Sequence, residues 1–358
     1  MTIMRLADIL YKVPVNEIAD TSLPVFSVTK HAGFVRSDQY FRKQVFSSDL
    51  TRYKYVAKGD FAYATIHLDE GSIGVAPEDG LISPMYTVFQ VDATMVHAAY
   101  LLRYLKSPRA LASYAGMGNG TVERRRSISF DALSRLEIDL PALEEQQRIA
   151  ALLDQVDELR AKRRRTLALL NELRESLFRS LLNAAESPYA VVKVRELVRL
   201  RSGKFLPSKA MVTRGAVPVY GGNGVNGRHN VAMYEEPRII IGRVGAHCGS
   251  VHVTAAKSWV TDNALICDWD ENVMLLGYLA HALRYAKLNQ YAATTDLRQI
   301  SARRIGELPL VVPPMRIQEL YVHNSYEVGK LLAHAEADLA KLDELFASLQ
   351  HRAFTGRL

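Results

Sequence analysis

One segment of this 358-residue sequence has the spacing of a dinucleotide phosphate site. Residues 222–227 read Gly-Asn-Gly-Val-Asn-Gly, which matches the pattern G-x-G-x-x-G. In a dinucleotide site that pattern opens a helix, and an acidic residue follows about 20 residues later. Here Arg228, His229 and Asn230 follow, which is no helix start. The segment is instead typical of a turn with positive φ, either purely structural or exposed so that its side chains meet nucleic acid.

Side chains in and after this segment could read bases, since arginine pairs with guanine and asparagine with adenine. The candidates are Asn223, Asn226, Arg228 and His229. Two further places suit phosphate contact, because basic side chains there adjoin flexible or polar segments. They are the run Arg124, Arg125 and Arg126, and Arg298 at the equivalent place later in the chain. For these two places the alternative is a solvated basic surface.

The residue patterns of several enzyme classes are missing from the sequence. The ten histidines show no metal-ligand spacing, and Cys248 and His252 would supply only two ligands of a tetrahedral set. There is no G-x-S-x-G motif, no complete phosphate loop of the P-loop type, and no Asn-Pro-Pro-aromatic string of the kind that amino-methyltransferases of bases carry. The sequence therefore predicts neither catalysis nor a metal site within this chain.

The composition favours a soluble protein with anionic partners. Lysine and arginine exceed the acidic residues by seven. That surplus lies outside two long helical segments, with +1 in residues 1–141 and +6 in residues 186–314, so we expect the globular segments to contact an anion. With two cysteines, no apolar leader and no apolar run long enough for a bilayer, we expect a reducing cytoplasmic location without membrane contact.

The chain contains an internal repeat that relates its first half to its second half. Residues 167–177 and 339–349 match at seven of eleven positions. In the same register Pro141 falls on Pro313, Gln146 on Gln318, and residues 128–129 on 300–301. Self-similarity over this length indicates that each half has the same plan, a mixed segment followed by a long helix.

The two helical segments, about 144–182 and 316–354, each follow a proline and carry apolar residues at heptad spacing. A helix of about 39 residues with one apolar stripe requires a partner, so we expect the two segments to pair antiparallel. The same stripe could bind partner subunits, for which the candidates are Ile149, Val156, Leu170, Leu177, Val328, Leu342 and Leu349. The stripe breaks at residues 162–165, where Arg163 and Arg164 could meet DNA phosphate or acidic partner helices, or form a solvated surface.

These elements define an α+β fold, with two mixed α/β domains separated by two long antiparallel helices in a pseudo-two-fold arrangement. We expect domains at 1–141 and 186–314 and helices within 142–185 and 315–358. Residues 238–245 and 249–254 are predicted strands, with 71–75 as the counterpart of the latter, and residues 95–106 and 274–291 are predicted amphipathic helices.

The sequence resembles the specificity subunits of type I restriction–modification systems. The resemblance rests on residues 140–149 (Leu-Pro-Ala-Leu-Glu-Glu-Gln-Gln-Arg-Ile), residues 349–356, and the glycine loops 220–224 and 242–245, all in the family's order. Two features depart from the family: the second helix entry, residues 312–318, lacks the acidic pair, and the first domain has no clear equivalent of the Tyr220 loop.

The resemblance implies a non-catalytic subunit that selects a bipartite target on double-stranded DNA. Each domain would read one half-site in the major groove, and the helices would set the unread gap. Modification subunits would bind the helices and methylate adenine using S-adenosylmethionine, and restriction subunits would cut using ATP and magnesium. In the first domain the candidate base contacts are His31, Arg36 and the run 124–126.

Three alternatives remain at this point. A coiled-coil scaffold would bind protein and show no salt-dependent affinity for DNA. A nucleotide-binding enzyme would use the loop 222–227 and depend on Gly224. A specificity module of a related defence system would have different partner subunits.

Overall fold

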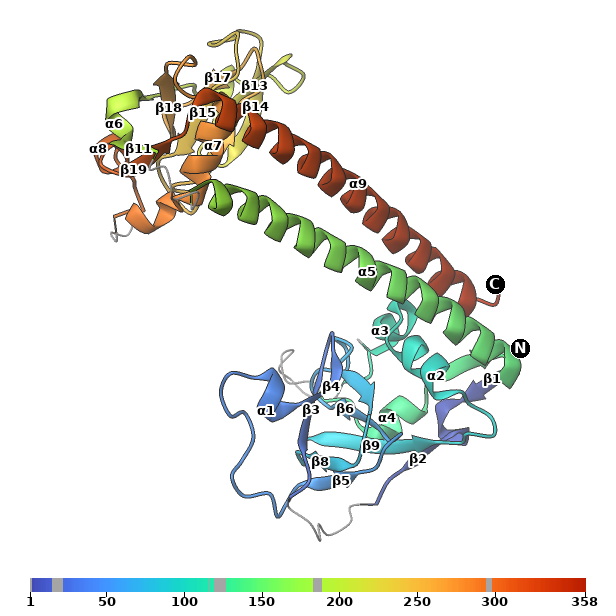
Figure 1. Ribbon diagram of the computed structural model, residues 1–358. Helices are drawn as coiled ribbons and strands as arrows, with labels where there is room; N and C mark the ends of the chain where they lie inside the picture. The colour runs from blue at the N-terminus through green and yellow to red at the C-terminus, as the bar shows by residue number, and fades with distance from the viewer. Residues whose placement is uncertain (1, 15–21, 115, 119–126, 183–188, 294–297) are drawn as a thin grey trace. The chain divides into compact units, whose positions relative to one another are not determined.

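In the computed structural model the chain forms two compact units, and both long helices are shared between them (Figure 1). Unit 1 comprises residues 1–165 and 337–358, and unit 2 comprises residues 166–336. The structure describes residues 2–14, 22–114, 116–118, 127–182, 189–293 and 298–358. Each unit has a set of short strands, a few short helices, and one segment of each long helix.

Unit 1 holds two four-stranded sheets and one two-stranded ribbon, ordered β2-β9-β6-β7, β4-β3-β8-β5 and β1-β10. The pairs are antiparallel except β3 with β8. The elements are β1 (Thr2–Arg5), η1 (Leu6–Asp8), β2 (Leu10–Lys12), β3 (Val25–Thr29), β4 (Gly33–Arg36), α1 (Ser37–Tyr40), β5 (Lys54–Val56), β6 (Phe61–Ala64), β7 (Ile73–Val75), β8 (Gly80–Ile82), β9 (Tyr86–Val91), α2 (Ala98–Leu105), α3 (Pro108–Tyr114), α4 (Phe130–Ser134) and β10 (Glu137–Leu140).

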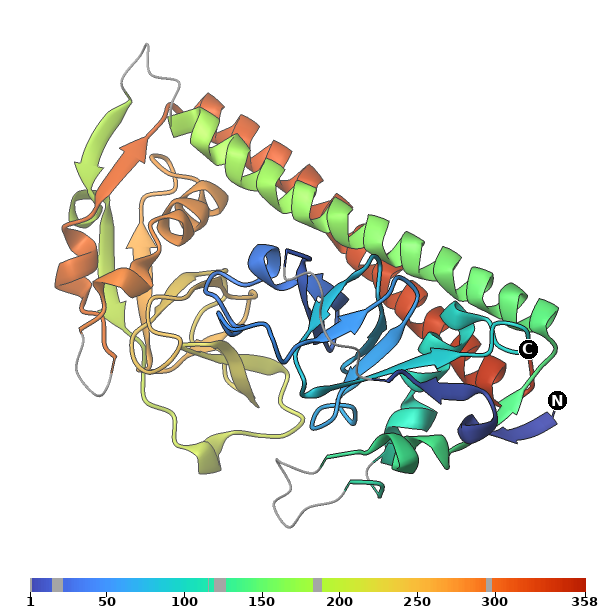
Figure 2. The same cartoon turned by 90° about the horizontal axis from the view of Figure 1, so that it is seen from below.

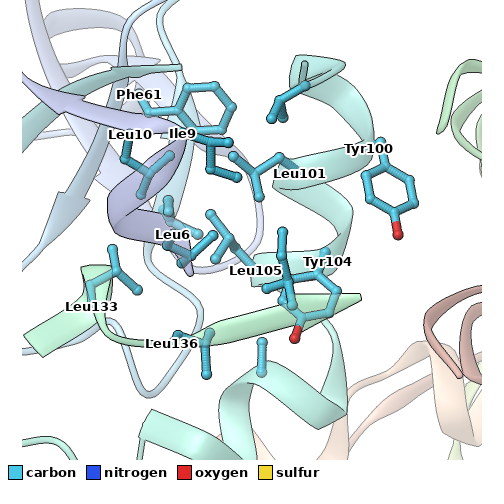
Figure 3. Close-up of a cluster of buried hydrophobic side chains, with 14 of the residues drawn as sticks. Leu6, Ile9, Leu10, Phe61, Tyr100, Leu101, Tyr104, Leu105, Leu133 and Leu136 are labelled. Carbon is cyan, nitrogen blue, oxygen red and sulfur yellow. The ribbon is translucent and has the colours of Figure 1, made fainter. Parts of the chain in front are cut away.

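The main core of unit 1 joins the sheets to the helices. Leu6 and Ile9, close to the N-terminus, are fully buried and face Leu101 and Leu105 of α2, while Leu133 closes the cluster from α4 (Figure 3). The same core includes residues of both long helices, among them Ile149, Leu153 and Phe354. Burial of this apolar surface therefore fixes the sheets against the helix pair.

Unit 2 repeats this plan with sheets ordered β12-β18-β15-β16 and β14-β13-β17 and a ribbon of β11 with β19. The ribbon forms the edge seen at the left of Figure 2, where yellow-green β11 lies beside orange-red β19. The elements are β11 (Ala190–Lys193), α6 (Val194–Leu197), β12 (Val198–Ser202), η3 (Ser208–Ala210), β13 (Val217–Gly221), β14 (Gly224–His229), β15 (Ile239–Gly242), β16 (Val251–Val253), β17 (Trp259–Val260), β18 (Ala264–Trp269), α7 (Leu276–Tyr285), η4 (Leu288–Tyr291), α8 (Ala302–Gly306) and β19 (Pro309–Val312).

The repeat extends through the sheets at a second constant offset in residue number, here called the sheet register. Strands β6, β7 and β9 correspond to β15, β16 and β18, and one constant shift relates their first residues. In this sheet register Phe61 falls on Ile239. A slightly shorter shift, the helix register, relates Ile128 to Ile300 and everything that follows. The predicted equivalence of residues 71–75 with the strand at 249–254 is therefore confirmed, and the change of register falls between α2 and residue 128.

The long helices are α5 (Leu143–Leu182) and α9 (Met315–Phe354). In unit 1 the first part of α5 packs with the last part of α9, where Ile149 and Phe354 share a core. In unit 2 the last part of α5 packs with the first part of α9, and the Phe178 ring lies 5.5 Å from the Tyr321 ring. Both pairings run antiparallel, as the sequence predicts. The domain bounds proposed from the sequence stay a prediction.

Candidate DNA interface

The segment 222–227 forms the turn of a hairpin between β13 and β14. Gly221 pairs with Gly224 across the turn, and Gly222 and Asn223 form its tip. Gly224 has φ of +88°, a conformation that side chains with a Cβ adopt at a cost. A strand, and no helix, follows the glycines, so the geometry of a dinucleotide site is missing here.

The four polar candidates of this hairpin differ in solvent exposure and in the contacts they already make. Asn223, Asn226 and Arg228 are exposed. The ladder slips by one residue between Val219 and Tyr220, which leaves Asn226 as the extra residue of a β-bulge. Bulges re-aim side chains, so this asparagine can project independently of the ladder. Arg228 keeps one weak contact, from Nη1 to the Gly215 carbonyl at 3.4 Å.

His229 is held by its neighbours. Its Nδ1 donates to the Ala210 carbonyl at 3.0 Å, and its ring lies edge-on to Trp259 at 5.4 Å. The ring therefore has one nitrogen left for a ligand. Its position at the base of the hairpin serves packing in the free protein.

A second loop supports the hairpin tip and brings Arg298 to it. A Cβ added to Gly242 would lie 2.5 Å from the Gly222 carbonyl oxygen, so only glycine permits this approach. The loop then binds the late segment of unit 2 through the Gly245 N–H, which donates to the Arg298 carbonyl at 2.9 Å. The structure thus assembles the hairpin, the loop 242–245 and Arg298 in one surface region.

Arg243 belongs to this region and was missed among the sequence candidates. It is half-buried and its Nη1 lies 3.4 Å from the Ser202 hydroxyl. Its backbone ties the loop to two other segments of unit 2, because its N–H donates to the Asn263 carbonyl and its carbonyl accepts from the Ile300 N–H. The available signal was its place within the glycine loop 242–245.

The equivalent of this hairpin in unit 1 is β3–β4, which the sequence did not reveal. In both units the hairpin's first strand also pairs in parallel, β3 with β8 and β13 with β17. His31 lies at the exposed β3–β4 turn, as Asn223 does in unit 2. Arg36 is three residues from the closing pair, opposite Phe26, at the rung where Arg228 stands opposite Pro218.

The charge of Arg36 is already paired. Its Nε donates to Glu78 at 2.9 Å, and this pairing raises the pKa of the guanidinium. Both side chains are more than one third exposed, so water weakens the pair and a phosphate or base could replace it. Arg124, Arg125 and Arg126 lie outside the described residues.

The mid-helix arginines contact α9. Arg163 lies 3.1 Å from Asp338 and Arg164 lies 3.4 Å from Asp343, and Arg160 joins the same Asp343 at 2.6 Å. These pairs explain how the apolar stripe tolerates a basic run: the charges are matched between the two helices of unit 1. The structure pairs this run with acidic residues of the chain's own second helix, and contact of Arg163 and Arg164 with DNA or with a partner subunit stays a prediction.

The heptad residues proposed to bind partner subunits lie largely inside the chain. Ile149, Val156 and Val328 are buried, and the rest of the set, Leu170, Leu177, Leu342 and Leu349, are half-buried. Leu177 and Leu349 pack against the cores of their own units. The large apolar side chains that the helices expose to solvent are different ones, namely Leu159, Leu169, Leu173, Leu320, Tyr326, Leu331 and Leu345.

Two buried glutamines attach the long helices to the segments that precede α2 and α7. In unit 1, the Gln146 side chain accepts from the His97 N–H and donates to the Met95 and Pro141 carbonyls, each at 2.9 Å. In unit 2, Gln318 makes the equivalent three bonds to Leu275, Val273 and Pro313 at 2.9 to 3.0 Å. Both glutamines are fully buried.

Within the described ranges, no group of three or more histidine, cysteine or acidic side chains is arranged to hold a metal ion. The helices of the described chain include none that is both long and apolar enough to span a bilayer. Burial raises the pKa of both thiols, Cys248 and Cys267. These thiols are therefore poor nucleophiles and metal ligands.

A family model and a curated protein each match part of this chain. Residues 53–171, from β5 into α5, match the family model described as the type I restriction modification DNA specificity domain. The specificity subunit of the type I restriction enzyme EcoprrI from Escherichia coli is 25% identical over 131 residues, which cover 36% of this chain. That match spans 32% of the length of the E. coli protein.

Solved structures share the fold over the whole chain. The S subunit of a type I restriction–modification system from M. genitalium matches with a TM-score of 0.62 and 18% identity, covering 99% of this chain and 96% of that one. A chain from a study of assembly and conformational transition of the type I R-M system matches with a TM-score of 0.60 and 16% identity, covering 100% and 98%. The predicted fold class and the resemblance to type I specificity subunits are both confirmed.

Proposed function

We propose that this chain is the sequence-specific DNA-binding subunit of a type I restriction–modification system, and that the β3–β4 and β13–β14 hairpins each read one half of a bipartite target. The observation that carries this proposal is the equivalence of the two hairpins. They occupy the same place in the two units, and each presents an arginine at the same rung. Their remaining side chains differ, so two unlike half-sites are expected.

The residues divide by the contacts open to them. Asn223, Asn226 and Arg228 are exposed and able to form the paired hydrogen bonds that distinguish adenine and guanine in the major groove. Arg298 and Arg243 lie behind the hairpin tip, where phosphate contact would fix its register. In unit 1, His31 and Arg36 have the equivalent roles.

The chemistry belongs to partners in this proposal. Modification subunits would carry S-adenosylmethionine and methylate adenine, and restriction subunits would use ATP and magnesium. The exposed apolar residues of α5 and α9 would contact the modification subunits, because the buried heptad residues are occupied within the chain. All components would act in the cytoplasm.

Sequencing of N6-methyladenine in host DNA, with and without this gene, tests the proposal. Loss of one split motif on deletion is the expected result, and it gives the target directly. In a second arm of this experiment, the deleted gene is replaced by a copy that encodes the Arg228→Ala variant. If Arg228 reads a guanine, the variant should cost about 1–3 kcal/mol and relax one position in one half-site only.

Matched variants assign each contact. His31→Ala should change the opposite half-site from Arg228→Ala, because the two residues belong to different hairpins. Uniform weakening at all sequences would make Arg228 a phosphate contact. An unchanged methylome in a host whose modification subunits co-purify with the chain would refute the proposal and favour a scaffold that binds protein alone.

A further inference from the structure

Unit 2 contains a basic pocket whose charges are not balanced. The pocket has about 680 Å³ of free volume between the end of α5, α7 and the start of α9. Its walls include Arg174, His281, Arg284 and Lys287, with Glu175 as the acidic residue. Among the ion pairs of the described chain, none involves Arg174, Arg284 or Lys287.

The equivalent pocket of unit 1 contains two aspartates that the unit 2 pocket lacks. Helix α2 corresponds to α7 in the sheet register, so Arg103 takes the place of His281 and Lys106 that of Arg284. In unit 1, Arg103 lies on Asp154 and Asp157, with its Nη1 2.6 Å from Asp157. These carboxylates come from α5, so the arginine of the unit 1 pocket, which has about 580 Å³ of free volume, is paired within the chain.

Unit 2 has no such carboxylates at the equivalent positions. In the helix register, Asp154 and Asp157 correspond to Tyr326 and Gly329 of α9. Phe346, whose ring lies under Arg160 and Arg103 in unit 1, corresponds to Arg174. These changes remove two negative charges and add a positive one, while Arg160 is replaced by Leu332 and Ala347 by Glu175, so the two pockets differ in how their cations are paired.

His281 lies in the pocket wall with one ring nitrogen unsatisfied. It is 8% exposed and lines the pocket, yet its Nε2 is buried without a hydrogen-bond partner. Buried polar atoms are ordinarily satisfied. Lys287 is also unusual, since it adopts φ of +47° where glycine would be unstrained. This left-handed residue ends α7, where its N–H donates to the Arg284 carbonyl at 3.0 Å.

We propose that this pocket binds the phosphate group of a small molecule. Three fixed positive charges against Glu175 leave two unbalanced, which matches a phosphate dianion, and arginine forks suit phosphate oxygens. Arg284 is held in the pocket wall, because its Nε donates to the Val251 carbonyl at 3.1 Å. The site is separate from the hairpins and does not depend on the role proposed for them.

Titration of the full chain with inorganic phosphate, at ionic strength matched with chloride, tests the site by calorimetry and by the shift of the His281 ring ¹⁵N signal. Matching ionic strength removes general screening. Arg284→Met is expected to weaken phosphate binding about tenfold or more, since it removes a charged hydrogen-bonding group. Lys287→Met is a second variant, which removes a pocket charge that no ion pair of the described chain uses.

Lys106→Met is the matched control, because it removes the equivalent charge from the unit 1 pocket, whose arginine is already paired with two carboxylates. Its phosphate affinity should equal that of the wild type. A nucleoside monophosphate that binds more tightly than inorganic phosphate, with the same dependence on Arg284, would identify an ester ligand; equal affinity would identify the free ion. Three results would each overturn the proposal. The first is phosphate binding no stronger than in the chloride control, and the second is an equal loss of phosphate affinity in all three variants. The third is an effect of Arg284→Met on the binding of duplex DNA alone.

Discussion

Replacement of Gln146 by methionine tests how each long helix is attached to its unit. Methionine preserves the length and volume of the side chain but removes its amide. Three backbone groups then lose their partner: the His97 N–H and the Met95 and Pro141 carbonyls. These bonds are sealed from water, since Gln146 is fully buried. The same holds for Gln318→Met in unit 2.

The magnitude follows from counting the lost bonds. Each hydrogen bond contributes about 0.5–1.5 kcal/mol net, and a buried group left unpaired costs about 1–3 kcal/mol. Partial relaxation lowers the sum, so we expect a loss of about 3–5 kcal/mol in the local stability of the unit. Gln147→Met is the matched control, because that side chain is exposed. Its effect should stay within about 0.5 kcal/mol.

Amide hydrogen exchange is the appropriate assay, because two units need not unfold together. Peptides covering residues 95–98 should exchange faster in Gln146→Met by about tenfold for each 1.4 kcal/mol lost. Peptides covering residues 273–276 should respond to Gln318→Met in the same way. If Gln146→Met and Gln147→Met exchange alike at residues 95–98, the attachment does not depend on this amide and the reasoning is refuted.

Three further predictions concern charged and buried groups. Burial lowers the pKa of His281 to about 4, with Arg284 and Arg174 lowering it further and Glu175 opposing them. In the unfolded chain this ring takes a proton near pH 6.5, so acid favours the unfolded state. The free energy of unfolding of unit 2, measured by urea titration, should therefore fall by roughly 3 kcal/mol between pH 6.5 and 4. The same pH dependence in His281→Asn would contradict this. Glu78→Gln frees Arg36 and should strengthen nonspecific DNA binding at low salt, with a slightly steeper salt dependence; unchanged affinity would show that Arg36 does not reach DNA. Both thiols are buried, so maleimide should label neither Cys248 nor Cys267 until denaturant is added, and rapid labelling of the native chain would exclude the cores described.

The long helices are the part of the fold that the sequence predicts best. Their heptad spacing, the prolines before them and the repeat that aligns Pro141 with Pro313 place both within one or two residues of the observed bounds. The reason is physical: a paired helix requires apolar residues at a fixed period along its whole length. The aligned glutamines 146 and 318 also prove equivalent in the bonds they make.

The hairpin of unit 1 could not be found in the same way. Its turn runs from Thr29 to Gly33, whereas that of unit 2 runs from Gly221 to Gly224, so no glycine pattern is shared. A strand requires only side chains that suit each face, and many sequences meet that requirement. The change from the sheet register to the helix register further breaks any gapless comparison of the two halves.

Contacts between residues far apart in the sequence could not be predicted from the sequence either. Glu78 pairs with Arg36 from 42 residues away, and Asp338 and Asp343 meet the basic run from the other long helix. Sequence alone shows such arginines as free positive charges. The heptad leucines present the converse case, because the stripe that predicts pairing cannot tell an internal helix partner from an external one.

The two units therefore share their framework and differ in what they present. The framework, made of a glutamine attachment, a ribbon and a hairpin with one parallel neighbour, depends on backbone bonds and buried apolar surface that both halves retain. The differences fall on exposed turns and pocket walls: His31 against Asn223, and Asp154 against Tyr326. Changes at these positions cost the framework little, since exposed side chains contribute little to stability. Each half can thus acquire its own ligand preference, for a base sequence at the hairpin and for an anion at the pocket, while the fold remains the same.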